Sequence, residues 1–295
     1  MLKRVLTILL LGAGVCIFPG AGGGKGGKPA ERDDRSIRPK FDGEKIKLVN
    51  LREVWVGEKF IPRQFSKDGN ELLITTPHFS GLLLLRFDRN SIRKLCDDPG
   101  AGIMPRFLPE SNTVSYITSR GESQFAYNIS YRGIRTEIEP AQFFPELADG
   151  SKVTLRRGKL FLVKEGGYRE ISGYDKRVIH FDISSDKKLL FFTADDYIIY
   201  QYSVEGDNVV PVVRGRRGVV SPNGNYFIYE YPEIDGERLV SSELYLYDIR
   251  NDLNYPLTST RDVNEEYPVI SPDGMKLAFS DDGKIYLADV IAKIK

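Results

Sequence analysis

The chain has 295 residues, of which 42 are Lys or Arg, 41 are Asp or Glu and two are His, so its formal net charge is +1. This balance excludes the strong basic bias of nucleic-acid-binding proteins, and a hydrophobic content of 41% with 16 Tyr and 16 Phe excludes global disorder. Two cysteines cannot form a disulfide framework, and two histidines are too few for most metal centres or imidazole-based catalysis. We therefore expect no bound metal, no cofactor and no catalytic residues.

The first residues have the anatomy of a secretory signal peptide. Lys3 and Arg4 precede an apolar run from Val5 to Phe18, and small residues follow from Gly20 to Gly24. The run is shorter than the roughly 17 to 25 residues of a membrane-spanning helix, which favours export over a permanent helical anchor. We predict a signal peptide at residues 1–21 and a periplasmic or secreted protein.

Cys16 is a candidate lipidation site. It follows the small residues Ala13 and Gly14, an arrangement that is similar to the lipidation site of bacterial lipoproteins, although Val15 stands where Gly, Ala or Ser is expected. Two interpretations stay open. Either a lipid on Cys16 tethers the protein to a membrane, or Cys16 is an apolar residue of a segment that is removed.

Residues 22–43 are rich in Gly and Lys and predict a flexible linker. Within them, Gly22 to Lys28 has the spacing of a phosphate-binding P-loop up to its lysine, but Pro29 stands where Ser or Thr would bind magnesium. The linker interpretation is therefore preferred, and the folded domain is expected at residues 44–295.

From residue 44 onward, short runs of Val, Ile, Leu, Tyr and Phe recur between turn signals, and no segment shows a sustained helical period. The most distinct turn, Ser271–Gly274, is followed by the strand Lys276–Ser280, a tight turn and the strand Lys284–Val290. The acidic or Asn marker of this turn recurs at positions 68, 110, 149, 186, 223 and 273, at intervals of 42, 39, 37, 37 and 50 residues. A four-stranded propeller blade takes about 40 to 50 residues. The sequence therefore predicts an all-β protein, a six-bladed β-propeller of four-stranded antiparallel blades.

The last blade has room for only three strands before Lys295. The segment Lys45–Leu51 alternates polar and apolar residues and precedes the first complete blade. We predict that it pairs with Ile285–Val290 as the outer strand of the last blade, because this N-terminal strand would close the ring and leave no open sheet edge. The alternative is that it forms an edge strand of the first blade.

Several stretches carry a family resemblance. Tyr267–Ser280 reads YPVISPDGMKLAFS and Ile285–Asp289 reads IYLAD, while the preceding blade has Ser221–Gly224 followed by LYLYD at Leu244–Asp248. These stretches resemble the WD40-like (PD40) repeat of the TolB-like six-bladed β-propeller family, and the resemblance covers about residues 44–295. It implies a propeller that lacks the N-terminal domain of TolB, with a non-enzymatic role in binding other proteins or peptides of the cell envelope.

In such a fold, the turns equivalent to Ser271–Gly274 share one face of the ring, called here the turn face. The loops before the first strand and between the second and third strands of each blade share the opposite face, the loop face. Pro, Gly and a short polar side chain suit tight reversals, so Asp68, Asn223 and Asp273 are expected to cap turns rather than to bind a ligand.

The loop face carries the candidate binding residues. Blade five has an expanded hairpin, Pro232–Ser242, where blade six has only Asp281–Gly283, and extra loop length on a rigid scaffold commonly serves binding. A rim of arginine, tyrosine and acidic side chains suits a protein or peptide partner, although a solvated charged rim without a ligand is the alternative. The candidate partner-binding residues are Arg214, Arg216, Arg217, Tyr231, Glu233, Asp235, Arg238, Arg261 and Tyr267.

No G-x-S-x-G nucleophile motif is present, and His78 and His180 do not form a metal-binding pair in sequence. We predict a monomeric, non-enzymatic, exported propeller that binds another envelope protein or peptide and no nucleic acid. The alternative is a secreted propeller hydrolase or lyase that acts on a polysaccharide or peptide. A third hypothesis is a lipid-tethered subunit of a larger membrane complex.

Overall fold

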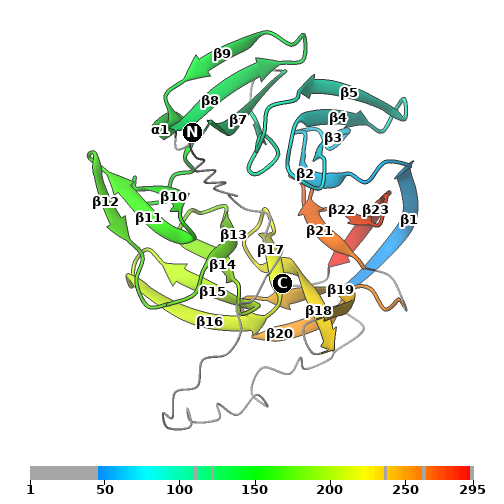
Figure 1. Cartoon of the computed structure of the whole chain (residues 1–295). Coiled ribbons are helices and arrows are strands. Elements are labelled where there is room, and N and C mark those ends of the chain that lie inside the picture. The colour runs from blue at the N-terminus through cyan, green and yellow to red at the C-terminus, as the bar shows by residue number, and fades with distance from the viewer. Residues whose placement is uncertain (1–45, 109–111, 121–122, 236–237, 261–263, 293–295) are drawn as a thin grey trace, which may run out of the picture.

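The computed structural model describes residues 46–108, 112–120, 123–235, 238–260 and 264–292. Six antiparallel sheets surround a central axis as the blades of a propeller (Figure 1). The described residues include one short helix, α1 (Pro140–Phe143), and none that combines the length and hydrophobicity of a membrane span. The predicted all-β, six-bladed architecture is confirmed. The predicted signal peptide, linker and lipidation site lie outside the described residues.

The strands of each blade are arranged from the axis outward in the order given below. Blade one contains β2 (Ile61–Phe65), β3 (Glu71–Thr75), β4 (Leu82–Arg86) and β5 (Ser91–Cys96), and blade two contains β6 (Arg106–Phe107), β7 (Thr113–Arg120), β8 (Ser123–Ser130) and β9 (Arg135–Ile138). Blade three contains β10 (Lys152–Arg156), β11 (Lys159–Lys164) and β12 (Gly167–Glu170), and blade four contains β13 (Val178–Ile183), β14 (Leu189–Ala194), β15 (Ile198–Ser203) and β16 (Asn208–Arg214). Blade five contains β17 (Arg216–Val220), β18 (Tyr226–Asp235), β19 (Arg238–Asp248) and β20 (Leu253–Pro256), and blade six contains β21 (Glu266–Ile270), β22 (Lys276–Asp281), β23 (Lys284–Ala292) and β1 (Ile46–Val56).

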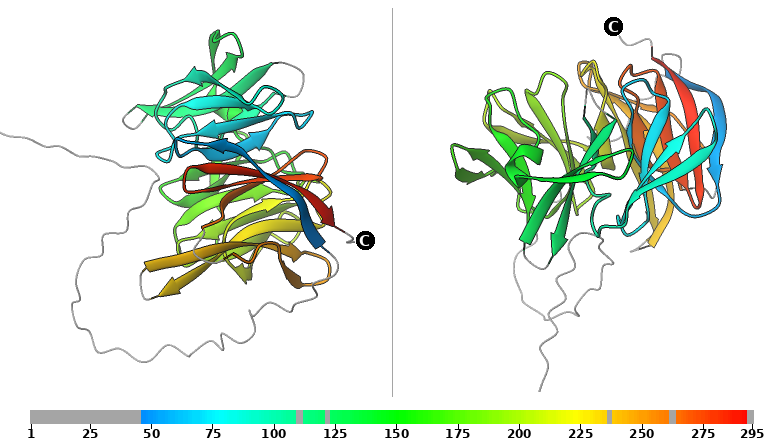
Figure 2. Two further views of the ribbon diagram at one scale, coloured as in Figure 1. Left: turned by 90° about the vertical axis from the view of Figure 1, so that its right-hand side faces the viewer. Right: turned by 90° about the horizontal axis from the view of Figure 1, so that it is seen from above.

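The first described strand closes the ring. β1 runs antiparallel to β23, with Ile46 opposite Ala292 at one end and Val56 opposite Lys284 at the other, and Figure 2 shows the two strands side by side in blade six. Ile46 also packs into an apolar cluster between blades five and six. The predicted pairing is confirmed, and blade one has its four strands without β1.

Blade three differs from the prediction of four strands. Its innermost strand is reduced to an isolated bridge between Glu146 and Lys152. The chain enters this blade through α1 and Pro145, and a proline has no N–H for a strand ladder. The buried side chains of Phe143 and Phe144 pack beside blade two in the space next to this entry. A short helix and a proline therefore replace the regular inner strand.

The turn markers act as the predicted caps. Ser271 Oγ donates a hydrogen bond to Asp273 and accepts one from the backbone N–H of Lys276 at 2.8 Å. Gly274 has a φ of 74°, which a residue without Cβ adopts at little cost. The same contacts recur in blades one, four and five at Asp68, Asp186 and Asn223. The marker in blade two lies outside the described residues.

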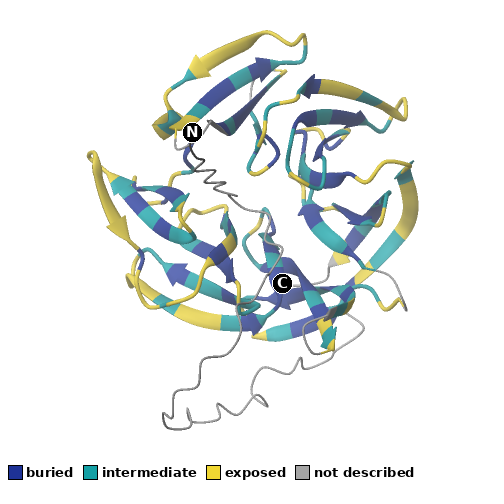
Figure 3. Ribbon diagram, in the orientation of Figure 1, coloured by how far each residue is buried: buried dark blue, intermediate teal, exposed yellow. Residues whose placement is uncertain are grey.

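The core consists of apolar clusters between neighbouring sheets. Phe191 of blade four and Phe227 of blade five lie with ring centres 5.2 Å apart, and Leu85 of blade one packs in one cluster with Leu287 of blade six. Figure 3 shows that buried residues concentrate in the inner and middle strands, while the outer strands carry most of the exposed positions. The ring therefore provides a rigid support for the segments on its two faces.

Candidate functional site

The innermost strands of four blades contain β-bulges at similar positions. The strand register shifts between Pro62 and Gln64 in β2, Val178 and His180 in β13, Arg216 and Val219 in β17, and Glu266 and Val269 in β21. Arg217 and Tyr267 lie within two of these bulges and have φ values of 48° and 56°, in the left-handed region. A bulge redirects the side chains of its strand, and bulges next to functional sites are common. Here they bring side chains of different blades together at the centre of the ring.

A buried carboxylate organises this central cluster. Glu230 of β18 is fully buried, and its Oε2 lies 2.9 Å from Nη2 of Arg216 and 2.6 Å from Nη1 of Arg217. Its Oε1 accepts a hydrogen bond of 2.7 Å from the backbone N–H of Tyr267. Glu266 adds a second carboxylate, 3.0 Å from Nη2 of Arg216. Two arginines and two glutamates therefore form a network that joins blades five and six.

Arg217 and Tyr267 make a second set of contacts. The guanidinium carbon of Arg217 lies 4.0 Å from the centre of the Tyr267 ring, and Nη2 of Arg217 donates to the Tyr267 hydroxyl at 3.2 Å. Burial lowers the pKa of Arg217, but the interactions with Glu230, Tyr267 and Glu266 outweigh burial and the net shift is upward. The guanidinium is therefore a fixed positive charge at the centre of the ring.

Arg63 of β2 lies beside the same cluster from blade one. Its Nη2 donates to the backbone carbonyl of Ile103, and its guanidinium carbon lies 5.3 Å from the centre of the Phe79 ring. Phe79 in turn meets the edge of Tyr267 at 6.3 Å. Burial lowers the pKa of Arg63 to about 10, while Tyr267 raises it and Arg217 lowers it. Arg63 therefore stays charged at neutral pH.

His180 of β13 completes the cluster from blade four. Its Nε2 lies 3.2 Å from the backbone carbonyl oxygen of Gly218. Burial and the positive charges of Arg63 and Arg217 lower the pKa of His180 to about 3. The imidazole is therefore neutral near pH 7, and an N–H at Nε2 can donate to the Gly218 carbonyl.

A separate groove lies beside the expanded hairpin of blade five. Residues 231–235 and 238–241 extend β18 and β19 beyond their pairing with β17 and β20 and form a two-stranded ribbon, the blade-five ribbon. The groove has a volume of about 540 Å³. Tyr231 and Tyr245 meet in it with ring centres 5.0 Å apart. Its lining residues are Arg214, Tyr231, Pro232, Glu233, Ile234, Val240, Ser241, Glu243, Tyr245 and Thr260.

Two carboxyl groups meet at one end of this groove. Thr260 donates its backbone N–H to Glu243 at 2.7 Å and its hydroxyl to Glu265 at 2.6 Å. Burial raises the pKa of Glu265 to about 7, the hydrogen bond from Thr260 opposes the shift, and the adjacent Glu243 adds to it. Protonation of Glu265 near neutral pH relieves the repulsion between these two adjacent carboxylates.

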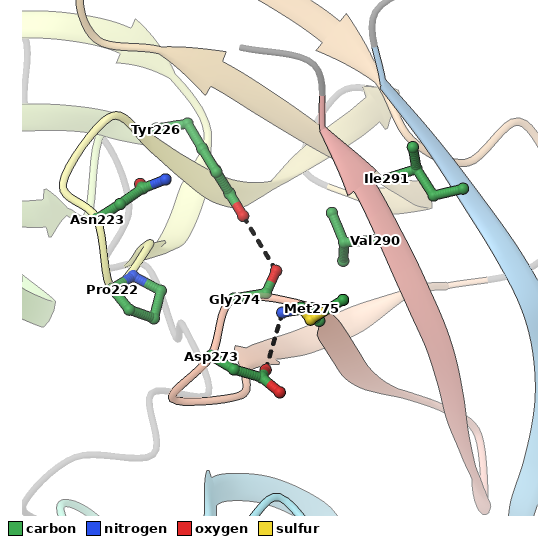
Figure 4. A pocket seen from close by; sticks show the side chains of 8 residues that line it. All are labelled: Pro222, Asn223, Tyr226, Asp273, Gly274, Met275, Val290 and Ile291. Carbon is green, nitrogen blue, oxygen red and sulfur yellow. Dashed lines mark hydrogen bonds between the residues drawn. The ribbon is translucent and has the colours of Figure 1, made fainter. Parts of the chain in front are cut away.

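The turn face contains another hollow, of about 580 Å³, between the turns of blades five and six. Figure 4 shows its lining, in which the Tyr226 hydroxyl donates to the Gly274 carbonyl at 3.4 Å. The side chain of Met275 is 63% exposed and Ile291 is 47% exposed at its rim. Apart from the Tyr226 hydroxyl, its polar side chains, Asn223 and Asp273, are turn caps.

Solved structures with the same architecture include two propellers of low sequence identity. An oligogalacturonate lyase in complex with manganese has 11% identity and a TM-score of 0.54, and covers 85% of this chain and 98% of its own. A putative TolB from Agrobacterium tumefaciens has 17% identity and a TM-score of 0.53, with the same coverage. This chain has the TolB-like propeller fold. No protein family and no curated protein matches its sequence.

Several predicted site residues of this TolB-like propeller lie together in the groove. Arg214, Tyr231 and Glu233 line it, and Asp235 is exposed at the far end of the blade-five ribbon. Arg238 pairs with Asp235 through the backbone ladder, and Arg261 lies outside the described residues, as does Cys16. The part of the chain that the structure describes contains no group of three or more His, Cys, Asp and Glu side chains arranged to hold a metal ion.

Two placements differ from the sequence analysis. Arg216, Arg217 and Tyr267 were expected at the rim of the loop face, but they lie in the inner strands β17 and β21, and Arg216 is only 9% exposed. The bulges and the buried Glu230 draw them to the centre. The expanded hairpin is also not a loop, because its residues continue the strand pairing as far as Asp235 and Arg238.

Sequence reasoning missed Arg63, Phe79 and Glu230. A usable signal exists for part of the cluster, because Arg63, His180, Arg217 and Tyr267 each stand five or six residues before the turn marker of their blade. Glu230 has no such signal, since only the pairing of β18 with β17 places it opposite Arg216.

Proposed function

We propose that this protein is an exported, monomeric, non-enzymatic propeller that binds another protein or peptide of the cell envelope through its loop face. The groove beside the blade-five ribbon carries the proposal. It combines two tyrosines with an arginine and two glutamates beside a projecting segment of a rigid ring. Tyrosine and arginine are the side chains that most often contribute large shares of binding energy at protein interfaces.

The shape of the ribbon supports an extended or convex partner. β18 and β19 pair with each other beyond the ends of β17 and β20, so the ribbon stands above the ring with its groove at its base. Val240 of the ribbon is 50% exposed. An apolar side chain beside a pair of tyrosines and flanking charges is typical of a contact area with an apolar centre and a polar rim.

The TolB-like fold agrees with this proposal, since the resemblance implied binding of envelope proteins. Export to the periplasm or the exterior is part of the same proposal and depends on the sequence of residues 1–21. Lipidation at Cys16 would attach the protein to a membrane without changing the proposed binding site.

The test places a photocrosslinking amino acid at position 231 and, as a control, at position 168. Tyr168 is a half-exposed tyrosine on the outer strand of blade three. In intact cells, we expect one protein to be crosslinked from position 231 and not from position 168. The purified partner should then bind saturably, and Tyr231→Ala should weaken its affinity about tenfold while Tyr168→Ala leaves it unchanged. Equal crosslinking from both positions, or equal affinity of both Ala variants, would refute the proposed site.

The enzymatic alternative has one observation in its favour, the similar fold of an oligogalacturonate lyase in complex with manganese. It predicts that the purified protein, supplied with manganese, degrades oligogalacturonate. Turnover that His180→Ala abolishes would replace the binding proposal with this alternative. We expect no turnover.

A further inference from the structure

The central cluster contains one positive charge more than its carboxylates balance. Within the described residues, all ion pairs of Glu230 and Glu266 are made with Arg216 and Arg217. Among the described residues, no carboxylate lies within 4.0 Å of Arg63. The positive charge of Arg217 is close enough to lower the pKa of Arg63. Three guanidinium groups therefore face two carboxylates. Arg63 is partly exposed, and a guanidinium that is partly shielded from water without a counter-charge is unusual.

The hydrogen bonds of Arg63 are also incomplete. Nη2 donates to the Ile103 carbonyl, but Nε is buried and has no hydrogen-bond partner in the described structure. Nε–H and the neighbouring Nη–H form the edge of a guanidinium that binds a carboxylate through two parallel hydrogen bonds. Arg216 also has an unpartnered Nε, yet two carboxylates already contact its Nη2. Arg63 alone in this cluster lacks both a counter-charge and an Nε partner.

The other groups around Arg63 do not supply a negative charge. His180 is neutral and the pKa of Tyr267 is raised by burial, so its phenol is protonated at neutral pH. Asp182, the carboxylate of β13, accepts backbone hydrogen bonds from Val220 and Ile183 and lies beyond ion-pair distance of Arg63. The environment of Arg63 is therefore polar, positive and without an internal anion.

We propose that Arg63 is the anchor for one carboxylate of a bound polypeptide, either an Asp or Glu side chain or a free C-terminal carboxylate. This inference rests on the proposed function and names the chemistry that the partner presents. A single excess positive charge matches a single carboxylate, whereas a phosphate monoester carries about two negative charges. One face of the Phe79 ring and one face of the Tyr267 ring are already covered by a guanidinium, which disfavours stacking of a sugar ring there.

The test measures, by isothermal titration calorimetry, the binding of three unlabelled pools of random peptides of equal length to the full chain. The first pool carries one internal Glu and an amidated C-terminus, the second has no acidic residue and a free C-terminus, and the third has neither carboxylate. We expect the first or the second pool to bind about tenfold more tightly than the third, in keeping with a hydrogen bond to a charged group. The pool that binds identifies the source of the carboxylate.

Arg63→Gln should remove the preference for carboxylate, and Arg63→Lys should retain part of it because it keeps the charge without the guanidinium edge. The matched control is Arg93→Gln, an exposed arginine on the outer strand of the same blade, which should keep the full preference. A second readout excludes a purely structural role. Without peptide, Arg63→Gln should not lower the melting temperature, because it removes a partly shielded charge that has no counter-charge.

Each other outcome overturns the inference. If all three pools bind equally and Tyr231→Ala weakens their binding, the proposed function stands and the role of Arg63 is refuted. If no pool binds, the proposed polypeptide carboxylate is refuted. It is also refuted if only oligogalacturonate binds and Arg63→Gln abolishes that binding. A large drop in the melting temperature of peptide-free Arg63→Gln would show that Arg63 serves the fold.

Discussion

Replacement of Glu230 by Gln should destabilise the propeller strongly although it changes few atoms. Glu230 is fully buried and contacts Arg216 at 2.9 Å and Arg217 at 2.6 Å. When Glu230 loses its charge, Glu266 is the carboxylate that remains paired with these two arginines among the described residues. Removal of one partner of a buried ion pair costs about 3 to 5 kcal/mol. Gln keeps an oxygen for the Tyr267 N–H, so we expect a loss near the lower limit, about 3 kcal/mol.

For a domain of about 250 residues, this loss corresponds to a decrease of roughly 6 to 12 °C in the melting temperature. The assay is thermal unfolding followed by near-ultraviolet circular dichroism, which reports on the packed tyrosines. Glu233→Gln is the control, because Glu233 lies exposed on the same strand and accepts a hydrogen bond only from Ser241 within the described structure. Its effect should stay within about 0.5 kcal/mol.

A double-mutant cycle tests the cause of the loss. Arg216→Gln in the Glu230→Gln background removes one of the two arginines that lost their counter-charge. The double variant should therefore lose less stability than the sum of the losses in the two single variants. If Glu230→Gln melts within 2 °C of Glu233→Gln, or if the single effects are additive, the network does not hold blades five and six together in the way the distances imply.

Three further predictions concern the ring, the carboxyl pair and the turns. Deletion of residues 46–56 removes eight paired positions of β1 and β23. Size-exclusion chromatography should then show aggregation, or thermal unfolding a much lower melting temperature. Unchanged stability would contradict the closure of the ring by β1. The pKa of Glu265 is raised to about 7, so its contribution to stability is complete at acidic pH below its ordinary value and is lost as the pH rises through 7. Glu265→Gln should therefore gain in melting temperature relative to the unmodified protein between pH 5 and pH 8, and a constant difference would disprove the shift. Asp273→Ala should cost about 1 kcal/mol by chemical denaturation, because two hydrogen bonds of the turn are lost, whereas Asp235→Ala, at an exposed position, should change little.

The repeat in the sequence was sufficient to predict the ring and its closure. Turn markers such as Asp68 and Asp273 depend on local chemistry, so their spacing reports the number of blades directly. The missing inner strand of blade three could not be predicted in the same way. Its marker, Asp149, still caps a turn, but α1 and Pro145 occupy the place of the strand before it.

The candidate site was predicted only in part, for reasons of tertiary structure. Arg214, Tyr231 and Glu233 were found because they flank a hairpin whose length is visible in the sequence. Their meeting with Thr260 in one groove depends on the loop between blades five and six. The ion-pair network depends on a bulge that places Arg217 beside Glu230, and no local pattern encodes that pairing.

Both ends of the described chain leave the ring on the turn face. Ile46 pairs with Ala292 there, next to the point where the Val290 N–H donates to the Met275 carbonyl at 2.8 Å. The blade-five ribbon stands on the opposite side. An affinity tag or reporter joined directly to Ile46 or Ala292 would therefore start on the face opposite to the groove, and a sensor chip coated through such a tag would display the groove to the solution.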